Sequence, residues 1–207
     1  HVTAHGQVAL PEHLGSALEF DADVQGDLAD AATLVWRGSL DAYDLDFEQW
    51  AALLPESFVV PATGHGSFEV SARGVGRELA ALRLQPSLED LRLAGADGEF
   101  TRIGGDIRLQ HIAGTISVHA TGLELSRSGA PWRPTSLEAR LTREDGRITA
   151  AFARADYLRI ENIAALAALL PAGALREQIG TLAPRGELFG IDVALSGIEG
   201  RRLPEIT

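Results

Sequence analysis

The chain has 207 residues, 45% of them hydrophobic, and a formal net charge of −11 at neutral pH. All 18 basic residues are arginine, and lysine, cysteine and methionine are absent. This composition is typical of an ordered protein of one or two domains, and the missing cysteines exclude disulfides and thiolate chemistry. The acidic balance argues against nucleic acid and against electrostatic docking on anionic headgroups, because both need a basic patch.

The first residue is His1, so we expect a processed chain or a piece cut from a longer protein. No apolar run approaches the roughly 18 to 20 residues that span a bilayer, and no signal-peptide pattern is present. We therefore expect this piece to be soluble, with any anchor or signal upstream.

Alternation of apolar and polar residues is the dominant pattern from one end of the chain to the other, and it predicts β-strands with one buried and one solvated face. The alternating segments are 18–25, 34–41, 67–73, 106–110, 115–120, 136–142 and 147–152. Glycine-containing pairs at 97–98, 104–105, 128–129 and 145–146 predict tight turns between them. A mainly β protein with antiparallel neighbours follows.

Two short segments, 46–54 and 162–170, have helical spacing instead. Asp46 is expected to cap the first helix, with Gln49 completing a capping box, and Asn162 is expected to cap the second. Each helix ends at Leu-Leu-Pro, at Pro55 and Pro171. This shared order predicts two related β-rich units, residues 1–115 and 116–207; chance similarity between two Ala- and Leu-rich segments is the alternative.

Chemical motifs are weak throughout the chain. The histidines are expected at the surface, although His111 and His119 flank a predicted turn and would suggest a hydrolase if they met a carboxylate in a cleft. Asp21 and Asp23, with two further aspartates at 27 and 30, fit the solvated face of a strand better than a calcium site. We expect no catalytic residues, no metal, no cofactor and no nucleic-acid partner.

Large apolar residues, including Phe100, lie on the predicted inward faces of the strands. A filled sandwich and an open, gutter-shaped sheet both require this pattern. The pattern alone therefore leaves open whether the inner face is a core or a groove.

Several stretches resemble the YhdP branch of the AsmA-like proteins. They are Trp36 to Leu40 leading to Trp50 through Pro55, Ala164 to Pro171, Leu182 to Leu188, and the tail Leu195 to Pro204. The family is related to the TamB and chorein proteins, whose repeats form an extended, curved sheet with an apolar groove. The resemblance implies the middle segment of a periplasmic protein anchored in the inner membrane, which carries phospholipid toward the outer membrane.

On this interpretation the partners are phospholipid acyl chains and neighbouring repeats of the same chain. The groove would be lined by apolar residues from the inner faces of the strands: Leu18, Phe20, Val24, Leu34, Trp36, Leu40, Phe68, Val70, Ile107, Leu109, Ile116, Val118, Leu137, Leu141, Ile148, Phe152, Leu188 and Val193. The alternative is a structural or interaction module, a filled β-sandwich or β-solenoid of a larger surface or secretion protein.

Overall fold

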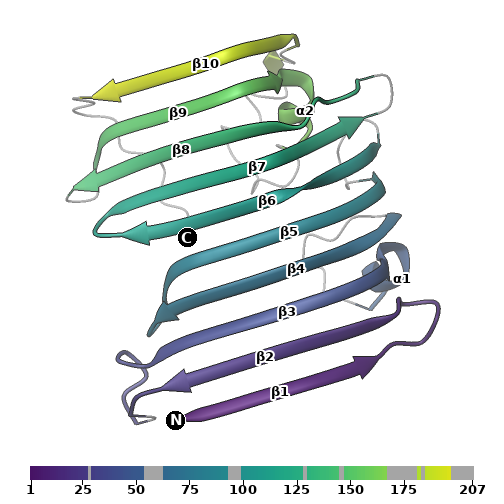
Figure 1. Cartoon of the computed structure of the whole chain (residues 1–207), viewed down its shortest axis with the longest axis vertical. Helices are drawn as coiled ribbons and strands as arrows, with labels where there is room; N and C mark the ends of the chain where they lie inside the picture. The colour runs from purple at the N-terminus through teal and green to yellow at the C-terminus, as the bar shows by residue number, and fades with distance from the viewer. Residues whose placement is uncertain are drawn as a thin grey trace.

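The computed structural model describes residues 1–27, 29–53, 63–92, 99–127, 130–144, 147–166, 181–182 and 185–196. Its strands form one ten-stranded sheet in which neighbours in sequence are also neighbours in space (Figure 1). Every neighbouring pair is antiparallel. The elements in chain order are β1 (Val2–Ala9), β2 (Ala17–Gln25), β3 (Val35–Asp46), α1 (Phe47–Ala51), β4 (Thr63–Val75), β5 (Glu78–Arg92), β6 (Phe100–Ile112), β7 (Thr115–Arg127), β8 (Thr135–Glu144), β9 (Arg147–Arg159), α2 (Ile160–Ala165) and β10 (Glu187–Ser196).

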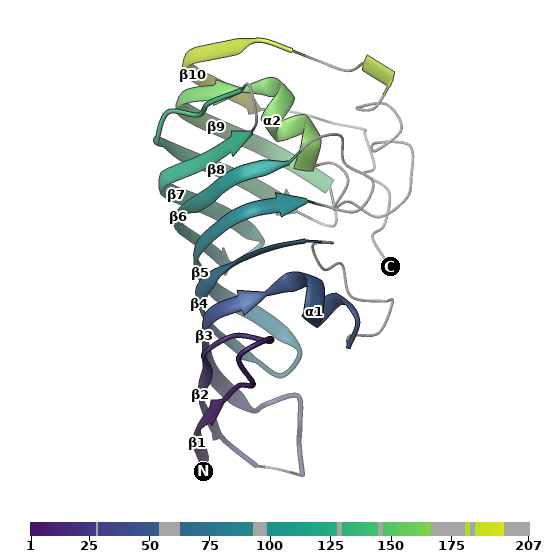
Figure 2. The same ribbon diagram turned by 90° about the vertical axis from the view of Figure 1, so that its right-hand side faces the viewer.

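The sheet is open and curved, as the family resemblance implied. Figure 2 shows it nearly edge-on, bent so that both helices lie on its concave side. Among the described strands, β1 and β10 each pair with a single neighbour, so the sheet does not close into a barrel. A mainly β, antiparallel fold with two short helices is therefore confirmed.

Two short connections show how glycine turns the chain between long strands. Ala113 and Gly114 join β6 to β7 with φ of 48° and 75°, the left-handed backbone that two-residue hairpin turns require. Gly76, with φ of 57°, does the same between β4 and β5. The predicted turns at 97–98, 128–129 and 145–146 lie outside the described residues.

The turn predicted at Gly104-Gly105 is wrong, because these glycines lie inside β6. The pairing of β6 with β7 shifts register between Gly104 and Asp106, and Gly105 has φ of 138°. Glycine therefore marks a β-bulge at this position, where one strand carries an extra residue. Two strands, β1 and β5, were not predicted at all.

Asp46 caps the first helix as predicted, but the predicted capping box with the Gln49 side chain does not form. The Asp46 side chain accepts hydrogen bonds from the backbone N–H groups of Glu48 and Gln49, and the Asp46 N–H itself donates to Leu14 O at 3.2 Å. The capping of the second helix was predicted wrongly, because its N-cap is Arg159 and Asn162 lies inside the helix, fully buried. Residues 54 and 167–170 of the two predicted helices lie outside the described residues.

The two helices occupy equivalent places, since α1 follows β3 and α2 follows β9 at the same end of the strands (Figure 1). The sheet runs without interruption through β6 and β7, where the predicted boundary between the two units falls. The division into units 1–115 and 116–207 remains a prediction.

Candidate functional site

Strand pairing places one apolar residue from each strand in a continuous line across the concave face. Because Cα partners in a β-ladder point to the same side, the partners can be followed from β1 to β10. This central row consists of Gly6, Phe20, Leu40, Val70, Leu84, Ile107, Ala120, Leu137, Ala155 and Ile191. No charged or polar side chain interrupts it.

A second row runs beside the first, two residues along each strand on the same face. This small-residue row consists of Ala4, Ala22, Gly38, Ala72, Leu82, Leu109, Val118, Ala139, Ala153 and Val193. Most members are alanine or glycine, so their side chains leave space above the sheet. All of them are half-buried or exposed, and none is buried.

At the strand ends that carry the helices, the concave face is filled by the protein itself. Phe100 is fully buried there, and Leu125, Trp132 and Tyr157 are no more than 5% exposed. The Trp132 and Tyr157 rings pack edge to face with their centroids 5.4 Å apart. We call this part, with the buried cluster that also includes Ala42, Leu45, Phe47, Leu91, Ala120 and Leu123, the helix half of the face.

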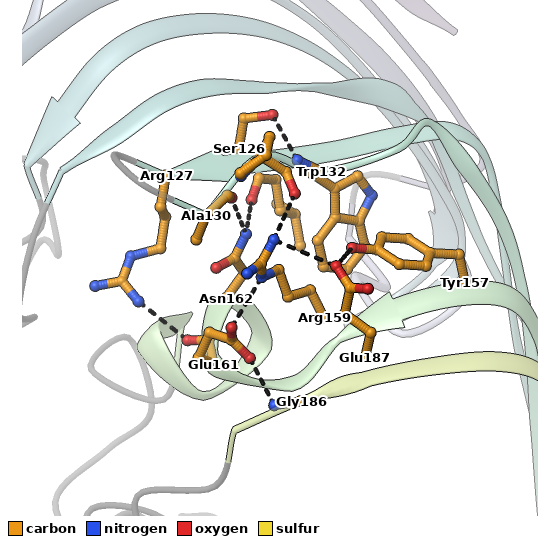
Figure 3. A network of polar contacts seen from close by, with 12 residues as sticks. Ser126, Arg127, Ala130, Trp132, Tyr157, Arg159, Glu161, Asn162, Gly186 and Glu187 are labelled. Carbon is orange, nitrogen blue, oxygen red and sulfur yellow. Dashed lines mark hydrogen bonds and ion pairs between the residues drawn. The ribbon is translucent and has the colours of Figure 1, made fainter.

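A polar network fixes α2 to the strands around it (Figure 3). Asn162 Nδ2 donates to Leu125 O, near the end of β7, at 2.6 Å and to Ala130 O, just beyond β7, at 3.0 Å. The Glu161 carboxylate accepts from Arg159 Nε at 2.8 Å and from Gly186 N at 2.9 Å. These bonds join β7, α2 and the start of β10 into one unit.

Two titratable groups respond to this environment. Hydrogen bonding from the Arg159 guanidinium lowers the pKa of Glu161 to about 2, with a smaller contribution from the Gly186 N–H. Burial raises the pKa of Tyr157, and its hydroxyl donates to the Glu187 carboxylate at 3.0 Å. Both groups therefore form hydrogen bonds that hold the elements of the helix half together.

The opposite strand ends, which we call the hairpin half, leave apolar side chains uncovered on the same concave face. Leu82, Leu109 and Leu141 are half-buried, while Val193 and Leu195 on β10 are 46% and 53% exposed. Neither described helix contacts this half. Contiguous apolar surface of this kind is typical of ligand-binding grooves and interaction sites.

Most of the residues predicted to line a groove share this concave face. By their partners, they are Leu18, Phe20, Val24, Trp36, Leu40, Phe68, Val70, Ile107, Leu109, Ile116, Val118, Leu137, Leu141 and Val193. Leu34 precedes β3 and lies next to Gly26. The side chain of Ile148 lies outside the described residues.

Phe152 and Leu188 are separated from the other predicted residues. Phe152 pairs with Arg140, and the Arg154 guanidinium lies over its ring at 5.5 Å, so it belongs to the outer, polar face. On β10, Phe189 lies on the concave face, where its ring contacts that of Tyr157. The neighbouring residue Leu188, which pairs with Leu158, therefore faces the other side. Alanines on both sides of Phe152 left the phase of the alternation undetermined in the sequence.

Sequence reasoning missed the contribution of β5 to the concave face. Leu82 and Leu84 alternate with Arg83 and Gln85, which is a strand pattern, but the apolar residues before them at 79–81 obscured it. Leu84 pairs with Val70 on one side and Ile107 on the other, and so completes the central row.

The two histidines considered for catalysis do not meet. His111 pairs with Ile116 on the concave face, whereas His119 pairs with Arg108 on the outer face. Among the described residues, no group of three or more His, Cys, Asp or Glu side chains could hold a metal ion. Neither described helix has the length and apolar character of a membrane span.

The outer face is mostly polar and charged, with a few apolar residues such as Val35, Val75 and Phe152. Arg83 and Arg108 each bind Asp106 through two nitrogens, at 2.7 to 3.2 Å, and these hydrogen bonds lower the pKa of the Asp106 carboxyl. The Asp23 carboxylate, predicted to be solvated, is instead buried, with His1 Nε2 at 2.6 Å and Arg37 Nη2 at 3.5 Å. Its burial results from these cross-strand partners.

A single open, curved antiparallel sheet with an apolar inner face and a mostly polar outer face defines a mainly β protein whose described strands do not close into a barrel. The sequence model of one family, described as YhdP protein, matches residues 1–203. The chain therefore belongs to the YhdP family, as the resemblance had indicated. No curated protein and no solved structure matches it.

Proposed function

We propose that the concave face holds phospholipid acyl chains, and that the chain is a segment of a bridge-like periplasmic protein that carries phospholipid between the inner and outer membranes. The observation that carries this proposal is that two apolar rows cross all ten strands. The residues of one of them, the small-residue row, remain half-buried or exposed. Membership of the YhdP family supports it.

The energetics favour acyl chains as the occupant. Transfer of a CH₂ group from water to an apolar surface contributes about 0.8 kcal/mol, so a chain gains affinity along its length without any specific polar contact. The alanines and glycines of the small-residue row leave room for it. Because the helix half is filled by Phe100, Trp132 and Tyr157, the acyl chains would lie in the hairpin half.

Movement along the sheet requires many positions of similar affinity. The small-residue row, which stays uncovered, repeats one apolar residue per strand, and this repetition supports exchange from strand to strand rather than tight binding at one pocket. The row extends to the edge strands β1 and β10, where neighbouring repeats of the same chain would continue it. The membrane anchor would belong to regions outside residues 1–207, and we expect no catalytic role.

Native mass spectrometry with lipid extraction, after expression in bacteria, tests the proposal. We expect phospholipid to accompany the purified chain and to be released by denaturation. If no phospholipid co-purifies, and vesicles do not supply any to the purified chain, lipid carriage by this segment is ruled out.

A second candidate is a structural or interaction module, and the filled helix half is the observation that favours it. In that case the exposed apolar residues of the hairpin half would pack against protein. The same experiment separates the two, because an interaction module would carry no lipid.

A further inference from the structure

A hollow of about 640 Å³ lies on the outer face, over strands β1 to β6. Each of these strands contributes three successive residues. The first and third of each three have their side chains on the outer face. The lining consists of Thr3 to His5, Asp21 to Asp23, Arg37 to Ser39, Ser71 to Arg73, Ala81 to Arg83 and Arg108 to Gln110. The hollow therefore faces away from the proposed lipid groove.

The middle of this hollow contains a symmetrical arrangement of polar side chains on β3 and β4. Arg37 and Arg73 are Cα partners, and two residues along the strands Ser39 and Ser71 are partners as well. All four lie on the outer face. Like charges placed directly opposite each other destabilise a sheet, so the Arg37–Arg73 pair needs a compensating contact.

The protein compensates only part of this positive charge. Arg37 Nη2 lies 3.5 Å from Asp23 Oδ2, but the same oxygen is only 2.6 Å from His1 Nε2. Asp21, the other carboxylate of the lining, is 2.8 Å from His5 Nδ1. Among the residues that the structure describes, Arg73 has no ion-pair or hydrogen-bond partner.

The neighbouring arginines define one wall of the hollow. Arg83 and Arg108 are both held by Asp106, so their guanidinium groups are fixed in place with two N–H donors each already engaged, although the one carboxylate offsets only one of their two positive charges. An incoming anion therefore meets Arg73 and Arg37 as the available cations. The net charge of the chain argued against anionic partners, but the strand register concentrates arginines at this one place.

We propose that Arg37, Arg73, Ser39 and Ser71 form a binding site for a phosphate group. A guanidinium presents a planar fork of N–H donors that matches a phosphate in bidentate geometry, and the serine hydroxyls add donors for the remaining oxygens. The hollow is far larger than a phosphate ion, so the group belongs to a larger molecule, either a soluble phosphate ester or a phospholipid headgroup. This site is separate from the groove and does not rest on the proposed function.

Calorimetry on the whole chain tests the site with two probes in phosphate-free buffer. The first is pyrophosphate, and the second is vesicles of phosphatidylcholine with and without phosphatidylglycerol. We expect saturable binding in at least one arm: a response to pyrophosphate identifies a soluble ligand, and a response only to phosphatidylglycerol vesicles identifies a headgroup.

Variants locate the binding. Arg73→Ala is expected to weaken it by at least about tenfold, since a charge-assisted pair of hydrogen bonds is lost. Ser39→Ala with Ser71→Ala should weaken it several-fold. Arg140→Ala is the matched control, because Arg140 lies on the same face but forms an ion pair with Glu138 at 3.3 Å. The Arg140→Ala variant should bind each probe with the affinity of the wild type.

Circular dichroism and the melting temperature establish that each variant is folded. Absence of binding in both arms overturns the proposal, as does an Arg73→Ala chain that is folded and binds as tightly as the wild type. The Arg73→Lys variant keeps the charge but not the fork, and should bind with intermediate affinity.

Discussion

Leu109 lies directly opposite Val118 in the ladder between β6 and β7, on the concave face of the sheet. The residue before it, Arg108, faces the outer side with His119. A single step along β6 therefore separates the apolar concave face from the polar outer face. This sharp division allows matched variants to test each face separately.

Introducing a charge on the concave face should reduce lipid binding. In Leu109→Glu a carboxylate would have to lose water against acyl chains, which is strongly unfavourable. We expect the phospholipid recovered per protein to fall by more than half. Ser117→Glu is the control, because Ser117 lies on the outer face between Gln110 and Arg140 and outside the hollow, and it should retain the wild-type amount; equal loss in both variants would contradict the assignment of faces.

Removing the Asn162 side chain should destabilise the region around α2. Asn162→Ala removes one donor from each of the Leu125 and Ala130 carbonyls, of which Ala130 O keeps the Arg127 N–H at 3.2 Å, and a buried group that loses its partner costs about 1 to 3 kcal/mol. Urea unfolding should show a loss of about 2 kcal/mol. Ile163→Ala, whose parent side chain is 39% exposed in the same helix, should lose less.

The Glu161 carboxylate should make stability depend on pH in acid. Its pKa of about 2 in the folded protein lies below its ordinary value of 4.5, so its ionised form is favoured by folding. The stabilisation is complete above pH 4.5 and is lost as the pH falls toward 2. Asp106 adds to the slope in the same direction, so the free energy of unfolding of Glu161→Gln should be compared with that of the wild type.

In that comparison the difference between the two proteins should shrink as the pH falls through this window. A difference that is constant from pH 6 to pH 2 would show that the Arg159–Glu161 contact does not stabilise the folded chain.

Alanine substitutions at two glycines should distinguish the cost of backbone strain from the cost of a steric clash. Gly114 and Gly122 have similar φ values of 75° and 60°, but a Cβ at Gly114 would lie 2.6 Å from Arg143 O, whereas one at Gly122 has nothing within 4 Å. Both alanine variants carry the strain of left-handed backbone, about 1 kcal/mol. Only Gly114→Ala must also displace β8, so its melting temperature should be lower than that of Gly122→Ala.

Much of the sheet could be predicted from the sequence because local alternation encodes it. Phe20, Leu40 and Val70 were correctly assigned to one face, and their strands follow directly from the pattern. The phase of β9 could not be predicted, since Ala150, Ala151 and Ala153 fit either face. Register decides it, through the pairing of Leu141 with Ala151.

Long-range contacts account for the remaining errors. Asn162 has the chemistry of a helix cap, but its partners are carbonyls of Leu125 and Ala130, which no local pattern identifies. The opposition of Arg37 and Arg73 likewise depends on the register between β3 and β4. The sequence supplied the residue types at these positions but not their neighbours.

Photo-crosslinking from a residue on the concave face tests the proposed lipid groove most directly. A benzophenone amino acid would replace Leu109 on the open part of the concave face, or Ser117 on the outer face away from the hollow, and the chain would be irradiated in bacteria and analysed by intact mass. We predict phospholipid adducts at Leu109 and none at Ser117. Absence of adducts at Leu109, or equal adducts at both positions, would contradict a groove that carries lipid.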